Sequence, residues 1–269
     1  MKRCISKLVG VCVVGLVLTL TALAAGHLGT GSSDEFRWQG QIAAGKTLEI
    51  KGVNGNVRAE AGSNGQAEVT AIKRGRRSDP KSVEIRVIEH GSGVTICAVY
   101  PGDTGHPNEC RPGEGGRMNT KNNDVSVDFS VHVPSGVRFI GRTVNGQIET
   151  SALKGEVEAY TVNGNVHVST SGYAHGTTVN GSITASLGSS DWTHPVRFET
   201  VNGSVTLELP TGTNAQFDAS TVNGNISTDF PLTIQGKLSP KHISGTIGSG
   251  GRELSLKTVN GSIELRRGH

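Results

Sequence analysis

The sequence has few of the residues that fill a compact core. Aromatic residues make up 4% of the 269-residue chain and apolar residues 34%, whereas glycine occurs 38 times. A compact globular domain normally carries a larger apolar share. The composition therefore favours a thin, elongated fold in which small β-branched side chains stack.

Motifs of several enzyme and cofactor-binding classes are also missing. The chain contains no CxxC, HExxH, GxGxxG, Walker loop or GGxGxD calcium repeat, and its nine histidines are scattered. We therefore expect no cofactor site and no metal site.

The first 24 residues have the pattern of a secretory signal peptide. A basic segment with Lys2, Arg3 and Lys7 precedes an almost wholly apolar run from Leu8 to Ala25, and small residues end it at Ala24. An uncleaved membrane anchor is the alternative, because 18 residues nearly span a bilayer. We predict export to the periplasm, cell surface or extracellular space, with residues 25–37 as a linker.

Charge excludes a general nucleic-acid partner. The chain has 26 Lys and Arg against 23 Asp and Glu, and the signal segment holds the three extra basic residues, which leaves 23 of each sign. A neutral chain has no overall attraction for polyanions. The basic run at residues 73–77, KRGRR, is interpreted as a solvated loop between two strands.

Two cysteines remain after the signal segment, which contains Cys4 and Cys12. An even number in an exported chain favours a disulfide between Cys97 and Cys110. It would close a loop of about a dozen residues and stabilise the fold by about 3 kcal/mol. A metal site would need more ligands than the nearby His106.

One tetrapeptide, TVNG, recurs through the C-terminal half. Its third position, with the related GVNG and HISG included, is Asn54, Asn145, Asn163, Asn180, Asn202, Asn223, Ser244 and Asn260. Spacings of 16 to 22 residues from Asn145 onward fit one coil of a β-solenoid each. We interpret the motif as a structural turn whose stacked side chains form ladders.

The repeats predict the architecture. We expect an all-β fold, a single-domain β-helix-like stack of about seven coils over residues 125–267. It continues from an irregular β region at residues 38–124, which includes a long polar loop at 101–124. Thr258 to Leu265 would be the last coil, with Arg266 and Arg267 guarding its edge.

Two columns of β-branched residues flank the repeated position. The first column, one residue before it, is Val144, Val162, Val179, Val201, Val222, Ile243 and Val259. The second column, three residues after it, is Ile148, Val166, Ile183, Val205, Ile226, Ile247 and Ile263. A continuous strand or a corner with Asn and Gly at positive φ would both account for the pattern, and both interpretations predict that the two columns are buried.

The motif resembles a known family. An alternating strand, PSG and repeated TVNGxI units from Asn123 onward are similar to the putative adhesin family of bacterial exported proteins, catalogued as domain of unknown function 4097. Members commonly repeat T-V-S-G-D-I, whereas this chain mostly has Asn for Ser and Asn, Ser or Gln for Asp. The resemblance covers roughly residues 45–267. It implies surface adhesion and supplies no catalytic residues.

Candidate reactive groups are few. Glu149 and His167 would lie on adjacent coils, where a surface ion pair is the favoured interpretation and a catalytic pair the alternative. Glu156 and Glu158 share a face of the half-repeat and are expected to be solvated.

We therefore predict an exported, non-enzymatic interaction or structural module of the cell envelope. Its partner would be an envelope glycan or protein, and it would contact the membrane only through an uncleaved signal segment. A polysaccharide-acting enzyme on a β-helix scaffold and an envelope-stress regulatory partner are the alternatives.

Overall fold

The structure, a computed structural model, describes residues 32–62, 65–102, 105–192, 194–234 and 239–268. The predicted signal peptide at residues 1–24 lies outside the described residues. Residues 31–269 form one compact unit that is built from β-strands, with one 3-10 helix, η1 (Pro80–Ser82). The predicted all-β class is confirmed.

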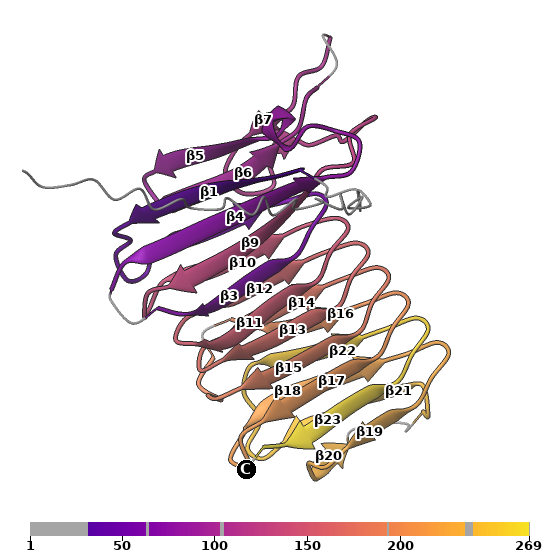
Figure 1. The fold of residues 1–269 in the computed structure, drawn as a ribbon. Helices are drawn as coiled ribbons and strands as arrows, with labels where there is room; N and C mark the ends of the chain where they lie inside the picture. The colour runs from indigo at the N-terminus through magenta and orange to yellow at the C-terminus, as the bar shows by residue number, and fades with distance from the viewer. Residues whose placement is uncertain (1–31, 63–64, 103–104, 193, 235–238, 269) are drawn as a thin grey trace, which may run out of the picture. The chain divides into compact units, whose positions relative to one another are not determined.

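Two large sheets make up the unit (Figure 1). Sheet A contains, in spatial order, β1 (Ser32–Gly40), β4 (Ala67–Gly75), β9 (Ser126–Val133), β3 (Val57–Ala61), β11 (Ile148–Leu153), β13 (Val166–Thr170), β15 (Ile183–Leu187), β17 (Val205–Leu209), β23 (Ile263–Arg267) and β19 (Ile226–Thr228). Sheet B contains β20 (Leu232–Ile234), β21 (His242–Ile247), β18 (Ala215–Ser220), β22 (Glu253–Lys257), β16 (Val196–Glu199), β14 (Ala174–Thr177), β12 (Val157–Tyr160), β10 (Arg138–Arg142), β2 (Thr47–Lys51), β6 (Gly93–Val99) and β5 (Glu84–His90). A small hairpin pairs β7 (Glu109–Cys110) with β8 (Gly116–Arg117).

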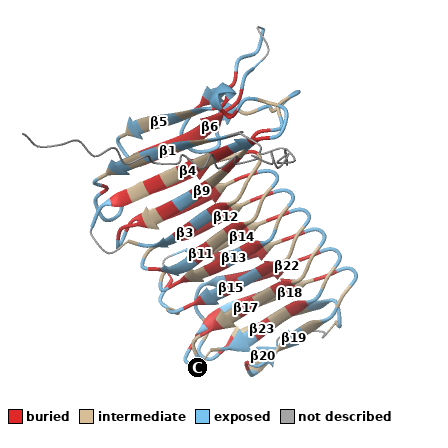
Figure 2. Cartoon of the chain, viewed as in Figure 1, coloured by how far each residue is buried: buried red, intermediate tan, exposed pale blue. Residues whose placement is uncertain are grey.

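The coils stack by parallel pairing in both sheets. Ile148 pairs with Val166, Val166 with Ile183, and Ile183 with Val205. All four are fully buried, so this part of the second column lies in the core, whereas Ile226 at the edge is half-buried. Burial alternates along the sheet A strands β13, β15 and β17 (Figure 2). The predicted β-solenoid is confirmed.

The first predicted column is not in the core, and this prediction is wrong. Its six valines, Val144, Val162, Val179, Val201, Val222 and Val259, are 36% to 61% exposed, and Ile243 is half-buried. TVNG is a corner that joins a sheet B strand to a sheet A strand, so the alternation of a continuous strand does not extend through it. The valine side chains point outward there.

Threonine takes the inward position at this corner. Six threonines are buried: Thr143, Thr161, Thr178, Thr200, Thr221 and Thr258. Each hydroxyl donates to a glycine carbonyl of a neighbouring coil at 2.8–3.0 Å. The bond satisfies a buried polar group, and so allows threonine inside the corner.

Asparagine forms a second ladder on the outside of the corner. Six Nδ2–Oδ1 hydrogen bonds of 2.8 Å join seven asparagines in the order Asn54, Asn145, Asn163, Asn180, Asn202, Asn260, Asn223. Ser244 has no place in the ladder, contrary to prediction, because it lies inside β21, which pairs antiparallel with β18. The other seven predicted positions form the ladder, and Asn54 lies at one end of it.

The coils do not stack in chain order. The last strand of the chain, β23, lies between β17 and β19, and β22 lies between β16 and β18 (yellow among orange strands in Figure 1). The prediction that Thr258–Leu265 forms the terminal coil is therefore wrong. At this end of the stack, β19 is the edge strand of sheet A and β20 the edge strand of sheet B.

Two predictions about the N-terminal region also need correction. Residues 32–37 of the predicted linker belong to β1, which pairs antiparallel with β4 and packs Phe36 and Trp38 against the core. Within the basic run, Lys73 and Arg74 belong to β4, where Lys73 is ion-paired with Asp34 and Arg74 with Asp128. Lys73 is buried because this pairing compensates its charge.

Candidate functional site

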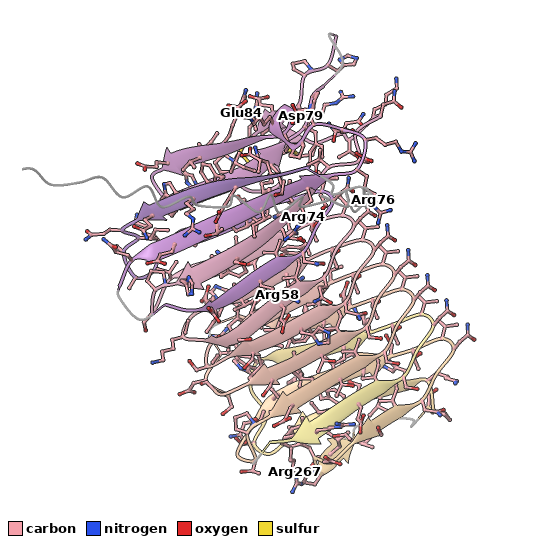
Figure 3. The ribbon with its side chains drawn as sticks, viewed as in Figure 1. Arg58, Arg74, Arg76, Asp79, Glu84 and Arg267 are labelled. Carbon is pink, nitrogen blue, oxygen red and sulfur yellow. A yellow bond between two sulfur atoms is a disulfide. The ribbon has the colours of Figure 1, made fainter. Side chains whose placement is uncertain are left out.

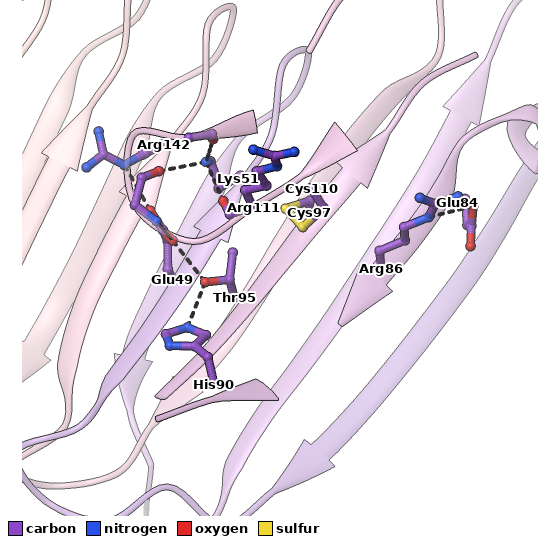
Figure 4. Close-up of a disulfide and its surroundings, with 12 residues drawn as sticks. Glu49, Lys51, Glu84, Arg86, His90, Thr95, Cys97, Cys110, Arg111 and Arg142 are labelled. Carbon is purple, nitrogen blue, oxygen red and sulfur yellow. Dashed lines mark hydrogen bonds and ion pairs between the residues drawn. A yellow bond between two sulfur atoms is a disulfide. The ribbon is translucent and has the colours of Figure 1, made fainter. Parts of the chain in front are cut away.

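The long polar segment after β6 is tied down over the outer face of sheet B. The predicted disulfide between Cys97 and Cys110 is present, with Cα atoms 5.8 Å apart (Figure 4). Lys51 Nζ donates to the carbonyls of Arg111, Gly113 and Gly115 at 2.7–2.8 Å. The segment is therefore held by one covalent bond and one buried ammonium group.

Glu49 compensates this buried charge. Its carboxylate accepts hydrogen bonds from Thr95 Oγ1, the Gly113 amide and Arg142 Nε at 2.9–3.1 Å. Burial lowers the pKa of Lys51, and the carboxylate of Glu49 opposes that shift. All these groups are paired within the fold, so the cluster is structural.

Neither the expected surface ion pair of Glu149 and His167 nor its catalytic alternative is formed. Glu149 and His167 are register partners on sheet A, as the repeat predicts. The Glu149 carboxylate instead forms an ion pair, at 3.0 Å, with Arg58 of β3, which flanks β11 on the side away from β13. Arg58 is labelled in Figure 3. Because Arg58 holds this carboxylate, the Glu149–His167 acid–base unit receives no support from the geometry.

A different cluster forms on the outer face of sheet B. In β10, β12, β14 and β16 the inward residues are buried and small or apolar, as Val157 and Ala174 are. The outward residues of the same strands place Glu158 beside His175 and His175 beside Arg197. The strand alternation thus aligns polar side chains from three coils into one row.

These side chains line a hollow of about 330 Å³. Its lining is Arg138, Glu156, Glu158, Tyr173, His175, His194, Pro195 and Arg197. Arg138 contacts Glu158 through Nη2, and its Nε lies 3.8 Å from Glu156. The Tyr173 and His194 rings lie 5.8 Å apart. The hollow combines aromatic faces with planar charged groups.

Tyr160 links this hollow to the buried cluster. Its hydroxyl donates to Glu158 Oε2 at 2.8 Å, and the Arg142 guanidinium lies 4.1 Å from its ring centroid. Its ring lies 5.5 Å from that of His175. The segment fixed by the disulfide is therefore connected, through Glu49 and Arg142, to the floor of the hollow.

Glu158 is not solvated as the sequence suggested, because it is only 8% exposed. Burial acts to raise its pKa, but hydrogen bonds from Arg138 and Tyr160 outweigh burial and the pKa is lowered. A general acid at neutral pH needs a raised carboxyl pKa instead. The carboxylate is therefore an acceptor that orients Arg138 and Tyr160.

We expect the free energy of unfolding to fall as pH drops below 6.5. Burial lowers the pKa of the His175 imidazole below its usual 6.5, although Glu158 and Glu199 oppose the shift. The unfolded chain then binds a proton more readily, so this stability is present above pH 6.5 and is lost below it, by at most about 1.4 kcal/mol per pH unit. Urea titrations between pH 8 and pH 5 measure the slope.

His175→Gln provides the control for this titration. The variant is expected to lose the part of the slope that arises just below pH 6.5. An unchanged slope in that interval would assign the effect to another group.

Only part of this site was visible in the sequence. The half-repeat places Glu156 and Glu158 on one face but does not indicate their neighbours, because Tyr173, His175 and Arg197 come from other coils. A signal was present in the half-repeats EVEAY, GYAHG and HPVRF, whose outward positions carry ring and charged residues where the TVNG side has mostly Thr and Ser.

The family model described as Toastrack DUF4097 matches residues 46–266. The chain belongs to the Toastrack DUF4097 family. This is the domain of unknown function that the repeats resemble, so the recognition is confirmed. No curated protein matches this Toastrack chain.

The solved structures that this Toastrack chain matches share little sequence with it. A putative cell adhesion protein from Clostridium sporogenes is 12% identical, with 88% of this chain and 100% of that chain covered, at a TM-score of 0.48. A putative adhesin from Bacteroides fragilis is 8% identical, with coverage of 87% and 97% and a TM-score of 0.35. A putative lipid binding protein from Parabacteroides distasonis is 9% identical, with coverage of 90% and 98% and a TM-score of 0.24.

No group of three or more His, Cys, Asp and Glu side chains among the described residues is placed to hold a metal ion. No described helix has the length and apolar character required to cross a membrane.

Proposed function

We propose that this Toastrack chain is an exported, non-enzymatic interaction module of the cell envelope that binds its partner on the outer face of sheet B. The observation that carries the proposal is the hollow that gathers Tyr173, His175, Arg138 and Arg197 around the oriented carboxylate of Glu158. Aromatic faces with a few placed polar groups are typical of binding sites. The adhesin-type repeats and the signal-like N-terminus support the envelope location.

The two outer faces differ in what they offer a ligand. On sheet A, the outward residues on the coils after His167 are mostly threonine and serine, as Thr184 and Thr206 are. The Arg58–Glu149 pair lines a smaller hollow there, of about 210 Å³, without an aromatic ring. Sheet B offers rings, guanidinium groups and carboxylates within one concave site. We therefore assign recognition to sheet B and scaffolding to the TVNG corner.

Binding to isolated envelope material tests the proposal. Tyr173→Ala is expected to weaken binding of the full chain by tenfold or more, because it removes a half-buried aromatic face from the hollow. His167→Ala removes an exposed ring from sheet A and is the matched control, with binding unchanged. Equal affinities for all three proteins, or no binding to envelope polysaccharide or protein, would refute the assignment.

A further inference from the structure

Three hollows adjoin one another on the sheet B side. A second hollow, of about 530 Å³, shares Arg138 and Glu156 with the hollow already described. A third, of about 310 Å³, shares Lys46 and Gly91 with the second and extends to Trp38. We infer that the three form one trough that binds a linear, uncharged polysaccharide; this inference rests on the proposed function of sheet B.

The trough runs across the strands. Most of its lining comes from β6, β2, β10, β12, β14 and β16 or from the turns that precede them, and these strands are consecutive neighbours in sheet B. At the third hollow, β5 and the end of β1 in sheet A also contribute. Five interstrand spacings give a length of about 24 Å. A site of that length accommodates an extended polymer rather than a single small molecule. It would hold on the order of five sugar units if one unit spans about one interstrand spacing.

Glycines create the middle of the trough. Gly45 and Gly136 turn the chain at positive φ of 79° and 77°, and a Cβ on Gly155 would lie only 2.4 Å from the Val137 carbonyl oxygen. Side chains are thus excluded where these turns stack, and Gly45 donates to the carbonyl of Gly136 at 2.8 Å. The floor there is peptide backbone, open to a ligand that lies along it.

The lining favours an uncharged ligand. Three basic residues, Lys46, Arg138 and Arg197, are balanced by three carboxylates, Glu89, Glu156 and Glu158. This balance provides no excess of one sign to attract a polyanion or a polycation. Planar charged groups still donate and accept the hydrogen bonds that sugar hydroxyls need.

Aromatic rings lie toward both ends of the trough. Trp38 lines the third hollow and Tyr173 the first. Tyr173 offers an apolar face, on which the C–H face of a sugar ring packs, and a polar edge. Trp38 packs partly against the core and adds its remaining surface to the third hollow. An extended peptide would instead pair with an open sheet edge, which this trough, crossing the strands, does not present.

Tryptophan emission reports whether a ligand reaches the Trp38 end. The chain has two tryptophans, and Trp192 is buried with Nε1 donating to Ser189. Trp192→Phe therefore leaves Trp38 as the single reporter. Uncharged oligomers of β-linked N-acetylglucosamine and of β-linked glucose, from two to six units, are the probes.

We expect the five-unit oligomer of one of the two series to bind at least tenfold more tightly than its two-unit oligomer, and the long oligomers to change Trp38 emission. Gly91→Gln fills the place where the second and third hollows meet, where a Cβ meets no atom within 4 Å, and should reduce five-unit affinity to the two-unit level. Gly212→Gln is the matched control, because its Cβ is equally open and lies outside the three hollows.

The possible failures are distinguishable. Length-independent affinity with unchanged Trp38 emission overturns the trough and leaves recognition at the first hollow intact. Binding to envelope protein or a charged polymer that depends on Tyr173, without binding of any uncharged oligomer, overturns the ligand class alone. If the Tyr173→Ala protein binds every probe and all envelope material as well as the unsubstituted chain does, the proposed function itself is overturned.

Discussion

Gly164→Ala is expected to lower the free energy of unfolding by about 3 kcal/mol or more. A Cβ at Gly164 would lie 2.1 Å from the carbonyl oxygen of Gly146 in the adjacent coil. Since no real Cβ contact is this short, the coils must move apart locally, and the threonine and asparagine ladders on either side must stretch. Equilibrium urea unfolding measures the change.

Gly91→Ala is the control for this effect. Its Cβ would meet no atom within 4 Å, so a change within about 0.5 kcal/mol is expected. Equal stability of the Gly164→Ala and Gly91→Ala proteins would contradict the close stacking of the corner glycines.

The second large effect is expected when the chain is ended at Lys257. This removes β23, whose Ile263 and Leu265 are fully buried and which pairs with β17 on one side and β19 on the other. We expect residues 205–234 to lose protection from amide hydrogen exchange, and the opened edge of β17 to promote aggregation.

A chain that ends at Arg267 retains β23 and is the matched control. It should keep the exchange protection of the full chain. If the shorter truncation also left β17 and β19 protected, the insertion of β23 between them would be wrong, since coils stacked in chain order would lose only the last coil.

The repeated motif predicts the coil, but it does not predict which side chain of the corner points inward. Thr161 and Val162 are both β-branched, and the alternation argument places Val162 inside. In the structure a turn intervenes, and the Thr161 hydroxyl bonds to the Gly146 carbonyl from the inside. Side-chain alternation could not predict this, because the choice depends on a hydrogen bond to another coil.

Coil order was equally inaccessible from the sequence. The corners at Asn202, Asn223 and Asn260 are nearly identical, so any of them fits beside any other. In sheet B the parallel stack ends at β18, because β21 pairs antiparallel with it and β20 forms the edge beyond. HISG matches the corner motif in spacing, but its residues lie within that strand.

The candidate site shows a similar division. Strand alternation predicts that Glu158 points outward, and it does so. Its burial depends on Arg138 from the preceding coil and on Tyr160 two residues later in the same strand. The sequence of one coil does not reveal the contacts with other coils. Arg138 lies 20 residues before Glu158, and His175 is placed beside Glu158 only by the parallel register.

Hydroxyl-radical footprinting with bound envelope polysaccharide tests most directly whether sheet B is the recognition face. Reduced oxidation of Tyr173, His175 and Trp38 is predicted, with the exposed corner valines Val162 and Val179 unchanged. Protection of the valine corner or of His167 on sheet A, with Tyr173 still oxidised, would contradict it.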